Sequence, residues 1–357
     1  MSKFHSIKVL DVYKETKDCS VVSFEIPEEL KTDFKYSHGQ HLTLRANIDG
    51  SEVRRSYSLC SSPTENKWQV AVKKINGGLF SAFVNDTLKK GDTLEIMPPN
   101  GVFFKPTDPS EAKNYIAFAA GSGITPILSI IKTHLALEPK STFQLFYLNR
   151  SVKSIIFKEE IELLKNKYFG RLEIFHFLTK EHRNVALLNG RFTKEKLKVL
   201  TDKIIDVPNT DDCFICGPEE MIFLIRDELM AAGMPKEKIH FELFSTGNSE
   251  ADKQRVTKIL ENKVVGTEVT ILDGGKEFHF IMDDDFDNIL DGALAAGADL
   301  PFACKGGVCS TCRCKVIEGS VEMKVNYALD ENEVAKNYIL SCQAVPTSKK
   351  VVVDFGA

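Results

Sequence analysis

Residues 304–312 read Cys304-Lys-Gly-Gly-Val-Cys309-Ser-Thr-Cys312, and a fourth cysteine, Cys342, follows thirty residues further on. This C-x4-C-x2-C…C pattern is the plant-type ligand spacing of a [2Fe–2S] cluster. One short loop supplies three thiolates and a distant segment supplies the fourth. The Gly-Gly pair lets the loop curl so that backbone N–H groups point at the sulfur atoms. The sequence therefore predicts four iron ligands: Cys304, Cys309, Cys312 and Cys342.

Zinc is the alternative metal for this loop. Structural zinc sites usually pair two C-x2–4-C knuckles, whereas here only one close pair precedes the lone Cys342. Cys314 lies on an expected outgoing strand and is predicted to pack in the core rather than bind metal. The nine cysteines are odd in number and no apolar leader segment opens the sequence. We therefore expect a reducing, cytoplasmic setting and no disulfide framework.

Composition narrows the class of protein. The chain has 357 residues, 43% apolar and 27% charged, which predicts two or three folded domains. With a mean hydropathy of −0.14, no stretch of about 18 apolar residues is present, so a membrane span is not expected. The net charge of −4 disfavours nucleic-acid binding. Residues 268–357 hold 8 Lys and Arg against 15 Asp and Glu, which predicts an acidic module that meets partners electrostatically or a merely solvated acidic surface.

The hydrophobic pattern predicts three domains. Short alternating runs separated by Gly and Pro predict an all-β domain, a closed barrel, at residues 1–106. Apolar strand runs alternate with helical patterns at 110–246, which predicts a doubly wound parallel α/β sheet. The polar stretch 247–264 is expected to be a linker, and about 18 flexible residues would span roughly 23 Å. Short strands, a helix and the cysteine loop predict a small α+β domain at 265–357.

A nucleotide site is predicted in the middle domain. The stretch Gly121-Ser122-Gly123-Ile-Thr125-Pro126 follows an expected strand and begins an expected helix. Small residues at such a turn let a pyrophosphate approach the backbone and the helix N-terminus. The third glycine of the common fingerprint is replaced by Pro126, which suits a first helical turn.

Two further strand ends bear on the same site. The next strand ends in Arg150-Ser151, with Lys158 downstream, where an NAD site often carries an acidic residue. These basic groups favour the 2′-phosphate of NADPH, and the alternative is that Arg150 is an ordinary exposed arginine. Cys216-Gly217-Pro218 follows another strand, where Cys216 is either a packing thiol or a small polarisable contact for a nicotinamide.

A flavin site is predicted in the barrel. Arg55 and Tyr57 share one face of an expected strand, where the arginine could clamp a phosphate while the ring stacks on a flat heterocycle. The stretch from Lys73 to Ser81 combines two lysines, a Gly-Gly turn and a hydroxyl before a helix, which is typical of an anion cradle. Either stretch alone is also typical of plain sheet or hairpin, and it is their combination ahead of a nucleotide domain that favours flavin.

Together these motifs resemble the ferredoxin–NADP+ reductase superfamily with a fused C-terminal plant-type ferredoxin domain. Residues 298–309 and 337–343 are similar to the reductase subunits of phenylacetyl-CoA epoxidases. The resemblance implies a Greek-key antiparallel FAD barrel, an NAD(P)-binding sheet and a β-grasp ferredoxin domain. In it Arg55 would bind the FAD pyrophosphate, Tyr57 would pack on the isoalloxazine, and Ser58 would hydrogen-bond near its reactive nitrogen.

The resemblance also implies the remaining site residues. The implied catalytic group is Tyr57, Ser58, Cys216 and Glu242. The implied cofactor-binding group is Arg55, Tyr57, Ser58, Val72, Lys74, Gly78, Leu79, Phe80, Ser81, Gly121, Ser122, Gly123, Thr125, Pro126, Arg150, Ser151, Cys216, Gly217, Pro218 and Phe244. The chain continues past Phe244, whereas plant reductases end in an aromatic residue that covers the flavin.

The expected function is that of an NAD(P)H:acceptor oxidoreductase. NADPH would give a hydride to FAD, two single-electron steps would reach the [2Fe–2S] cluster, and a di-iron oxygenase that epoxidises phenylacetyl-CoA in phenylacetate degradation would be the acceptor. One alternative is the reductase of another oxygenase, such as an aromatic-ring hydroxylase, with FMN as an alternative flavin. The other is a non-enzymatic redox-sensing or scaffold protein that has kept the fold.

Overall fold

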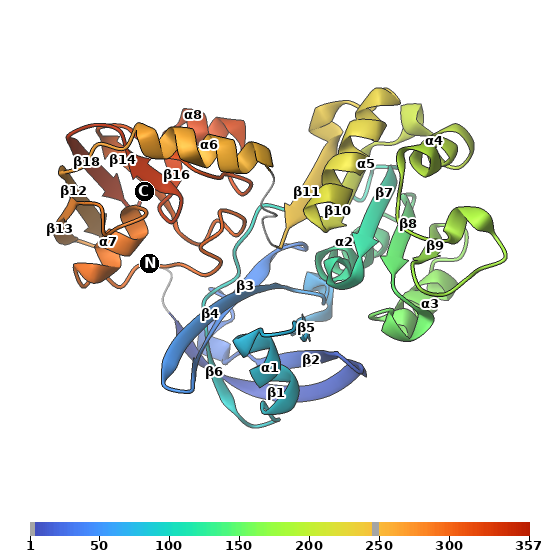
Figure 1. Cartoon of the computed structure of the whole chain (residues 1–357). Helices are drawn as coiled ribbons and strands as arrows, with labels where there is room; N and C mark the ends of the chain where they lie inside the picture. The colour runs from blue at the N-terminus through green and yellow to red at the C-terminus, as the bar shows by residue number, and fades with distance from the viewer. Residues whose placement is uncertain (1–3, 245–249) are drawn as a thin grey trace. The chain divides into compact units, whose positions relative to one another are not determined.

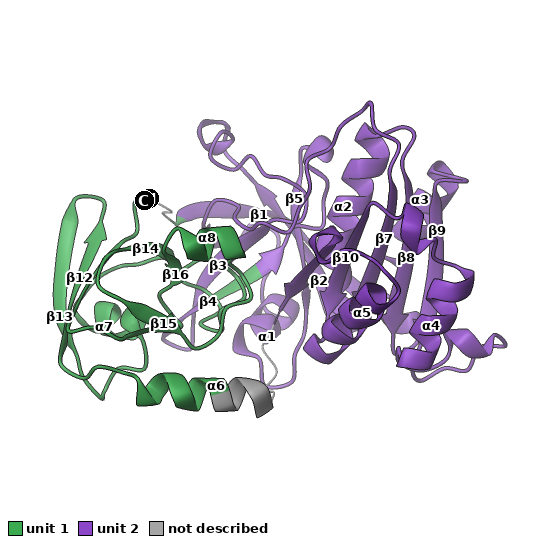
Figure 2. Ribbon diagram, turned by 90° about the horizontal axis from the view of Figure 1, so that it is seen from above, with its two compact units in different colours: residues 1–4, 54–56, 245–357 green, residues 5–53, 57–244 purple. Residues whose placement is uncertain are grey.

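The computed structural model describes residues 4–244 and 250–357 (Figure 1). The chain divides into two compact units (Figure 2). Unit 2 contains residues 5–53 and 57–244, and it includes both the barrel and the parallel sheet that the sequence predicts. Unit 1 consists mainly of residues 250–357 and includes the cysteine loop. Barrel and nucleotide sheet therefore form one compact body.

The barrel is a six-stranded sheet in the order β4-β3-β6-β1-β2-β5. Its pairs β1–β2, β1–β6, β2–β5 and β3–β6 are antiparallel. A bridge between Leu59, just after β4, and Val70 of β5 joins the two edges, so the sheet closes as expected. The elements are β1 His5–Thr16, β2 Cys19–Glu25, β3 His41–Ile48, β4 Ser51–Ser58, β5 Trp68–Lys73, β6 Thr93–Ile96, α1 Leu79–Asp86, and the 3-10 turns η1 Glu28–Leu30 and η2 Pro63–Glu65.

Helix α1 is fixed to the barrel by the buried side chain of Asn85. Its Nδ2 donates to the carbonyl of Val72 on β5, and its Oδ1 accepts from Lys14 Nζ and Ser20 Oγ, each at 2.9 Å. A single amide thus joins α1 to β1, β2 and β5. The glycine turn that precedes α1 is held at a fixed place on the barrel.

The α/β sheet is parallel, in the order β11-β10-β7-β8-β9. The chain starts in the middle at β7, runs outward to β9, and returns to β10 on the other side, so the strand order reverses between β7 and β10. Figure 2 shows α2 and α3 on one face and α4 and α5 on the other, the expected doubly wound arrangement. The elements are β7 Asn114–Ala120, α2 Ile124–Leu137, β8 Thr142–Asn149, α3 Lys158–Lys167, β9 Leu172–Leu178, α4 Lys194–Lys203, β10 Asp212–Gly217, α5 Glu219–Ala231, β11 Ile239–Leu243, and the 3-10 turns η3 Gly121–Gly123, η4 Val152–Ser154, η5 Ala186–Leu188, η6 Val207–Asn209 and η7 Lys236–Lys238.

Unit 1 contains a mixed five-stranded sheet in the order β13-β12-β18-β14-β16 and a small β15–β17 ribbon. The central pair β12–β18 is parallel, and the outer pairs are antiparallel. Helix α7 packs on it so closely that a Cβ on Gly292 would lie 2.2 Å from the ring of Phe280. The elements are α6 Glu250–Glu261, β12 Thr267–Asp273, β13 Lys276–Met282, α7 Ile289–Ala295, β14 Arg313–Glu318, β15 Val321–Met323, α8 Glu331–Ala335, β16 Tyr338–Leu340, β17 Ala344–Pro346 and β18 Lys350–Asp354.

The stretch 247–264, predicted to be a linker, contains the helix α6. Residues 247–249 lie outside the described residues. Ile259 on α6 is buried, and Lys263 just beyond it donates to the carbonyls of Asp283 and Phe286 at 2.6 and 3.1 Å. Residues 250–261 of the predicted linker are therefore helical, so the span of roughly 23 Å for a flexible linker does not apply to them. The sequence of α6 is mostly polar, but its few apolar residues recur at helical spacing, which is the pattern of a helix with one buried face.

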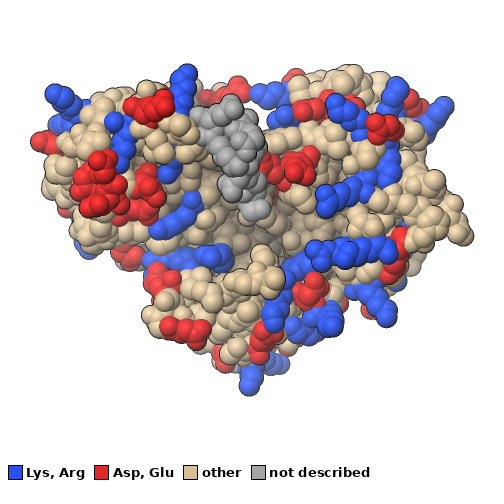
Figure 3. All heavy atoms as spheres, viewed as in Figure 1, with Lys and Arg blue, Asp and Glu red and all other residues tan. Residues whose placement is uncertain are grey.

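The acidic charge predicted for the C-terminal region is visible on the surface. In Figure 3, Asp and Glu side chains gather over the part of unit 1 that holds β13 and α7. None of the helices in the described ranges has the length and apolar character needed to cross a bilayer.

Buried histidines make the stability of unit 2 depend on pH. His41 is 4% exposed, and burial lowers its pKa to about 4. The folded state holds this side chain neutral, while the unfolded chain binds a proton below about pH 6.5. The stabilisation is thus present above pH 6.5 and is lost as the pH falls toward 4. We expect a loss of up to about 3 kcal/mol in the free energy of unfolding from this residue.

Urea unfolding at several pH values, followed by the fluorescence of Trp68, checks this expectation, because Trp68 is the single tryptophan and lies in the barrel. The variant His41→Met should flatten the decline between pH 6.5 and 4. The exposed His182 is the control, and His182→Gln should leave the slope unchanged. An equal slope in wild type and His41→Met would contradict the assignment.

Candidate functional site

A cleft of about 780 Å³ opens beside the N-terminus of α1 in unit 2. Gly78 is the N-cap of α1 and supplies no capping side chain. The first-turn N–H groups are therefore suited to an anion, and the left-handed φ of +73° at Gly77 turns the chain tightly before them. The cleft residues are Asp18, Asn47, Ile48, Asp49, Lys74, Ile75, Asn76, Gly77, Gly78, Leu79, Ala82, Phe83, Asp86 and Thr87. This cradle fits a phosphate-bearing cofactor such as FAD.

The structure separates the predicted flavin residues into exposed and buried groups. The side chains of Val72 and Phe80 lie in the barrel core. The Ser81 hydroxyl donates to the Gly78 carbonyl and accepts from the Ile75 N–H, both at 3.1 Å, so it shapes the glycine turn. Leu79 remains 55% exposed at the cleft. Only part of the predicted set therefore presents side chains to a ligand.

Three charged or aromatic residues of the predicted flavin set also contact neighbouring residues. Lys74 forms an ion pair with Asp86 across the cleft. Tyr57 on β4 is half-buried, with its ring centroid 5.8 Å from that of Phe80. Arg55, two residues earlier on the same strand, has an exposed side chain that donates to the Arg54 carbonyl at 2.7 Å. Arg55 and Tyr57 both lie on β4, and their predicted contact with one flavin stays a prediction.

The predicted nucleotide turn lies where the order of the parallel strands reverses. Residues Gly121–Gly123 form η3 between β7 and α2, and a Cβ on Gly123 would lie 2.2 Å from the carbonyl oxygen of Cys216 on β10. Gly121 has a φ of +53°, and its carbonyl accepts from the buried Tyr147 hydroxyl at 3.0 Å. Open α/β sheets bind ligands at this reversal point. The turn therefore fits a dinucleotide pyrophosphate.

The remaining residues of the 121–126 and 216–218 motifs contribute to the local structure of the two strand–helix turns. The Thr125 hydroxyl is buried and donates to the Ser122 carbonyl at 3.0 Å. Pro126 lies in the first turn of α2, as expected. A Cβ on Gly217 would lie 2.5 Å from Met221 Cε, which is the end of a flexible side chain, and 3.0 Å from Ala120 Cβ. Pro218 precedes α5 as its N-cap.

Lys73 lies near the glycine turn before α2, which the sequence did not predict. It lies on the barrel strand β5, and its Nζ would be 3.8 Å from a Cβ on Gly121. The sequence grouped Lys73 with Lys74 as part of one flavin cradle. Lys73 Nζ also lies 3.8 Å from Asp18 Oδ2, and Asp18 lines the cleft beside α1. Lys73 therefore lies between the cleft and the glycine turn, whereas Lys74 pairs with Asp86.

Three predicted catalytic residues come together between the barrel and the sheet. The buried Ser58 Oγ at the end of β4 donates to Glu242 Oε2 on β11 at 3.1 Å. Glu242 is directly paired with Cys216 in the β10–β11 register. Burial, with a smaller contribution from Glu242, raises the pKa of the Cys216 thiol well above its ordinary value. Cys216 is therefore a neutral thiol, and Phe244, just past β11, is 42% exposed.

The turn after β8 holds the residues predicted to read the coenzyme ribose. Arg150 has an exposed side chain, and Ser151 caps the short turn η4. A carboxylate also lies here, because Glu181 Oε2 accepts from the Val152 N–H at 3.0 Å. Glu181 is not among the residues predicted from the sequence, and it reaches this turn from beyond the neighbouring strand β9.

The cysteine loop in unit 1 is curled as the sequence predicts. Gly307 and two non-glycine residues, Lys305 and Ser310, have φ values between +51° and +76°. The Gly306 N–H donates to Cys304 Sγ at 3.3 Å, and the Gln343 amide donates to Cys342 Sγ at 3.7 Å. A Cβ on Gly307 would lie 2.9 Å from the Val325 carbonyl oxygen, so the loop is tightly covered.

The four predicted ligands form two thiol pairs. Cys304 and Cys309 hydrogen-bond to each other, and so do Cys312 and Cys342. The hydrogen bond from Cys309 lowers the pKa of Cys304 to about 6, against the effect of burial. In the described part of the chain, no group of three or more His, Cys, Asp and Glu side chains is arranged to hold one metal ion. Two pairs of thiols fit a cluster with two irons, each of which takes two protein thiolates.

Cys314 provides a matched control for the ligand assignment. It is 2% exposed on β14 among apolar side chains, and burial raises the pKa of its thiol. We expect Cys342→Ser to lose iron and the visible cluster absorbance, because one thiolate is missing. Cys314→Ala should retain both. Iron analysis and electron paramagnetic resonance of the reduced protein measure the outcome, and iron loss in Cys314→Ala alone would contradict the assignment.

Comparison with known families identifies the three regions. The oxidoreductase FAD-binding domain family matches residues 6–104, and the oxidoreductase NAD-binding domain family matches residues 118–227. The 2Fe-2S iron-sulfur cluster binding domain family matches residues 271–347. These ranges contain the cleft at α1, the turn at the strand reversal and all four ligand cysteines.

Similar proteins share the whole arrangement. A component of the 1,2-phenylacetyl-CoA epoxidase from Escherichia coli K12 is 43% identical over 357 residues, which is 100% of this chain and 99% of that protein. The ferredoxin reductase component of 3-ketosteroid-9-alpha-monooxygenase from Rhodococcus rhodochrous is 35% identical and covers 98% of this chain and 96% of its own length. Phthalate dioxygenase reductase, a modular structure for electron transfer from pyridine nucleotides to [2Fe–2S], matches with a TM-score of 0.59 and 25% identity over 99% of this chain and 98% of its own.

The order of the three domains, the full-length identity and the shared fold agree with the predicted resemblance. The chain belongs to the family of oxygenase reductases in which an FAD-binding barrel, an NAD-binding domain and a [2Fe–2S] ferredoxin domain are joined in one polypeptide.

Proposed function

We propose that this chain takes a hydride from NADPH at the Ser58–Glu242 contact and delivers single electrons to the oxygenase component of a phenylacetyl-CoA epoxidase. Flavin accepts a hydride and releases electrons singly, whereas a [2Fe–2S] cluster takes one electron, so together they convert paired electrons to single ones. The observation that carries the proposal is the 3.1 Å hydrogen bond that joins the barrel to the nucleotide sheet beside Cys216.

The residues at this contact have separate tasks. The Ser58 hydroxyl donates a hydrogen bond to Glu242. The Ser58 oxygen therefore remains able to accept a hydrogen bond from an N–H of a bound flavin. The buried Cys216 stays protonated and adds no charge where a nicotinamide ring would lie. The glycine turn before α2 would hold the coenzyme pyrophosphate, and Lys73 would add a positive charge beside it.

The acceptor is proposed from the relatives. The 43% identity to the Escherichia coli epoxidase component covers all three domains and favours a phenylacetyl-CoA epoxidase, whereas the 3-ketosteroid monooxygenase relative is 35% identical. None of the nine cysteines, all of which the structure describes, forms a disulfide, which supports a reducing cytoplasm as the place of action.

The acceptor is tested by mixing the anaerobically reduced holoprotein with purified oxygenase components. We expect oxygen-dependent epoxidation of phenylacetyl-CoA with the phenylacetyl-CoA epoxidase component, and at least tenfold slower oxidation of the reductase by the 3-ketosteroid component. Cys342→Ser should keep flavin reduction by NADPH but lose epoxidation, because the single-electron carrier is missing. Full epoxidation by this variant would contradict the proposed route.

Coenzyme choice is tested at the turn after β8. We expect Arg150→Ala to lower kcat/KM for NADPH by about 10- to 100-fold, as for one lost charge-assisted hydrogen bond, with NADH affected less than threefold. Glu181→Gln is the matched variant, because removing its charge should favour the 2′-phosphate and raise kcat/KM for NADPH. Equal losses with both coenzymes in Arg150→Ala would contradict the preference for NADPH.

A further inference from the structure

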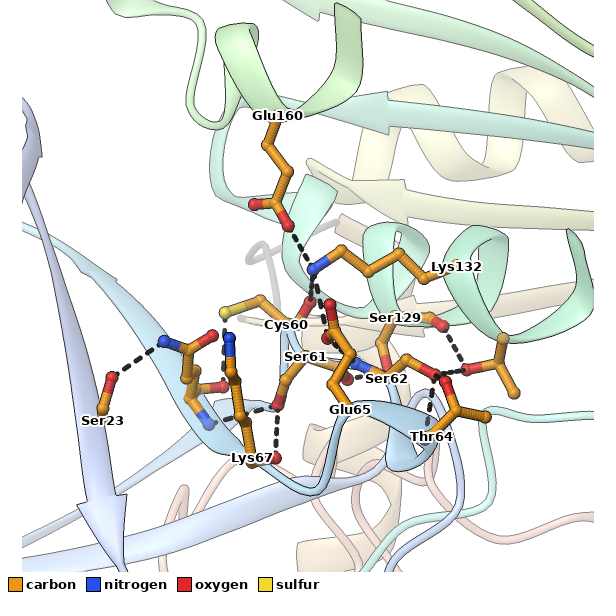
Figure 4. A network of polar contacts seen from close by, with 12 residues as sticks. Ser23, Cys60, Ser61, Ser62, Thr64, Glu65, Lys67, Ser129, Lys132 and Glu160 are labelled. Carbon is orange, nitrogen blue, oxygen red and sulfur yellow. Dashed lines mark hydrogen bonds and ion pairs between the residues drawn. The ribbon is translucent and has the colours of Figure 1, made fainter. Parts of the chain in front are cut away.

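The barrel and the nucleotide sheet meet at a polar seam, formed by residues 60–65 of the barrel and one face of α2 (Figure 4). Ser129 Oγ donates to the Ser61 carbonyl at 2.6 Å, and Thr133 Oγ1 and Ser62 Oγ share a hydrogen bond of 2.8 Å. Positions 129, 132 and 133 lie on one side of α2, because residues three and four apart share a helix face. The seam therefore fixes how the barrel and the α/β sheet are positioned against each other within unit 2.

Lys132 places a positive charge at the centre of the seam, where Figure 4 shows its amine between two carboxylates. Its side chain is 8% exposed and faces Glu65 of η2 at 3.4 Å, the Cys60 carbonyl at 3.5 Å and Glu160 of α3. Burial opposes the charged form, but Glu160 and Glu65 outweigh it and raise the pKa of Lys132. The lysine therefore stays charged and joins the barrel, α2 and α3.

The seam lies next to both predicted cofactor sites of unit 2. Cys60 follows Ser58 by two residues, so the barrel side of the seam continues directly from the strand that carries Tyr57 and Ser58. The α2 side continues from the glycine turn that would hold the coenzyme pyrophosphate. Any shift of residues 60–65 along α2 would therefore change the separation between the two predicted cofactor sites.

From this geometry, and resting on the proposed function, we propose that Lys132 is a positioning residue for hydride transfer. With Glu65 it fixes the end of β4 against α2, and so sets how a bound nicotinamide meets a bound flavin. The transferred group is a hydride, which is one proton with two electrons. It leaves the dihydronicotinamide, which becomes NAD(P)+, and it enters the flavin. Lys132 touches neither ring and acts only through the seam.

Two carboxylates allow the positioning role to be separated from stability. Glu65 ties Lys132 to the barrel, whereas Glu160 ties it to α3 in the same half of unit 2 as α2. Glu65 also accepts from the Ser62 N–H at 2.7 Å in a capping box, a role that glutamine can fill. Glu65→Gln therefore removes the charge across the seam while it keeps the local turn.

The test uses full-length holoprotein with FAD and cluster bound. Anaerobic stopped-flow absorbance gives the limiting rate of flavin reduction and the apparent Kd for NADPH. We expect Lys132→Met to lower the limiting rate at least tenfold with the Kd within threefold, and Lys132→Arg to restore most of the rate. The long-wavelength absorbance of the reduced flavin–NADP+ complex should weaken in parallel, because it reports ring stacking rather than turnover.

Glu65→Gln should lower the limiting rate at least threefold, and Glu160→Gln should leave it within twofold of wild type while it lowers the Tm. If Lys132→Met fails to fold, Glu65→Gln carries the test. An unchanged rate and an unchanged long-wavelength band in Glu65→Gln would overturn the inference. A wild-type protein whose flavin is not reduced by NADPH would instead overturn the proposed function.

Discussion

The close approach of two backbones at the strand reversal constrains the rest of unit 2. At Gly123 there is no room for a side chain, because the Cys216 carbonyl oxygen would lie 2.2 Å from its Cβ. This contact brings the first turn of α2 over the end of β10, and β10 pairs Cys216 with Glu242. Glu242 then reaches the barrel through Ser58. The nucleotide turn, the sheet edge and the barrel are thus linked through consecutive short contacts.

The two units solve different physical problems. In unit 2, glycines remove side chains so that large phosphate-bearing cofactors can approach the backbone. In unit 1, positive φ values curl a short loop so that thiols and N–H groups converge on a small site. The first arrangement is open and fits an exchangeable coenzyme, whereas the second is largely buried, with only Cys304 of the four ligands partly exposed, and fits a resident cluster. An electron converter needs both.

Most of the fold could be predicted from the sequence because it depends on local pattern. Alternating runs predicted the closed barrel, and strand–helix alternation predicted the parallel sheet with its reversal. The four ligand cysteines were predictable because three lie within nine residues. Cys216 was predicted from its place at a strand end, but its grouping with Ser58 and Glu242 came only from the family resemblance, since the three residues are distant in the chain.

The remaining site features depend on long-range contacts or on side-chain direction. The sequence could not show that Glu181 reaches the turn after β8, or that Lys132 lies between two carboxylates. It could not show that the Ser81 hydroxyl, which is predicted to contact a cofactor, also makes two hydrogen bonds within its own turn. Helix α6 was missed because its polar composition concealed apolar residues at helical spacing.

Helix α6 changes what an insertion or deletion in residues 250–261 would do. A coil absorbs one extra residue as slightly more slack, at little entropic cost. A helix of this length is a rod of about 18 Å, and each added residue rotates everything beyond it by about 100° about the axis. Since Ile259 is buried, such a rotation would turn an apolar side chain toward water. The number of residues in this stretch is therefore constrained by the rotation of the helix about its axis, and not by the distance that the chain has to span.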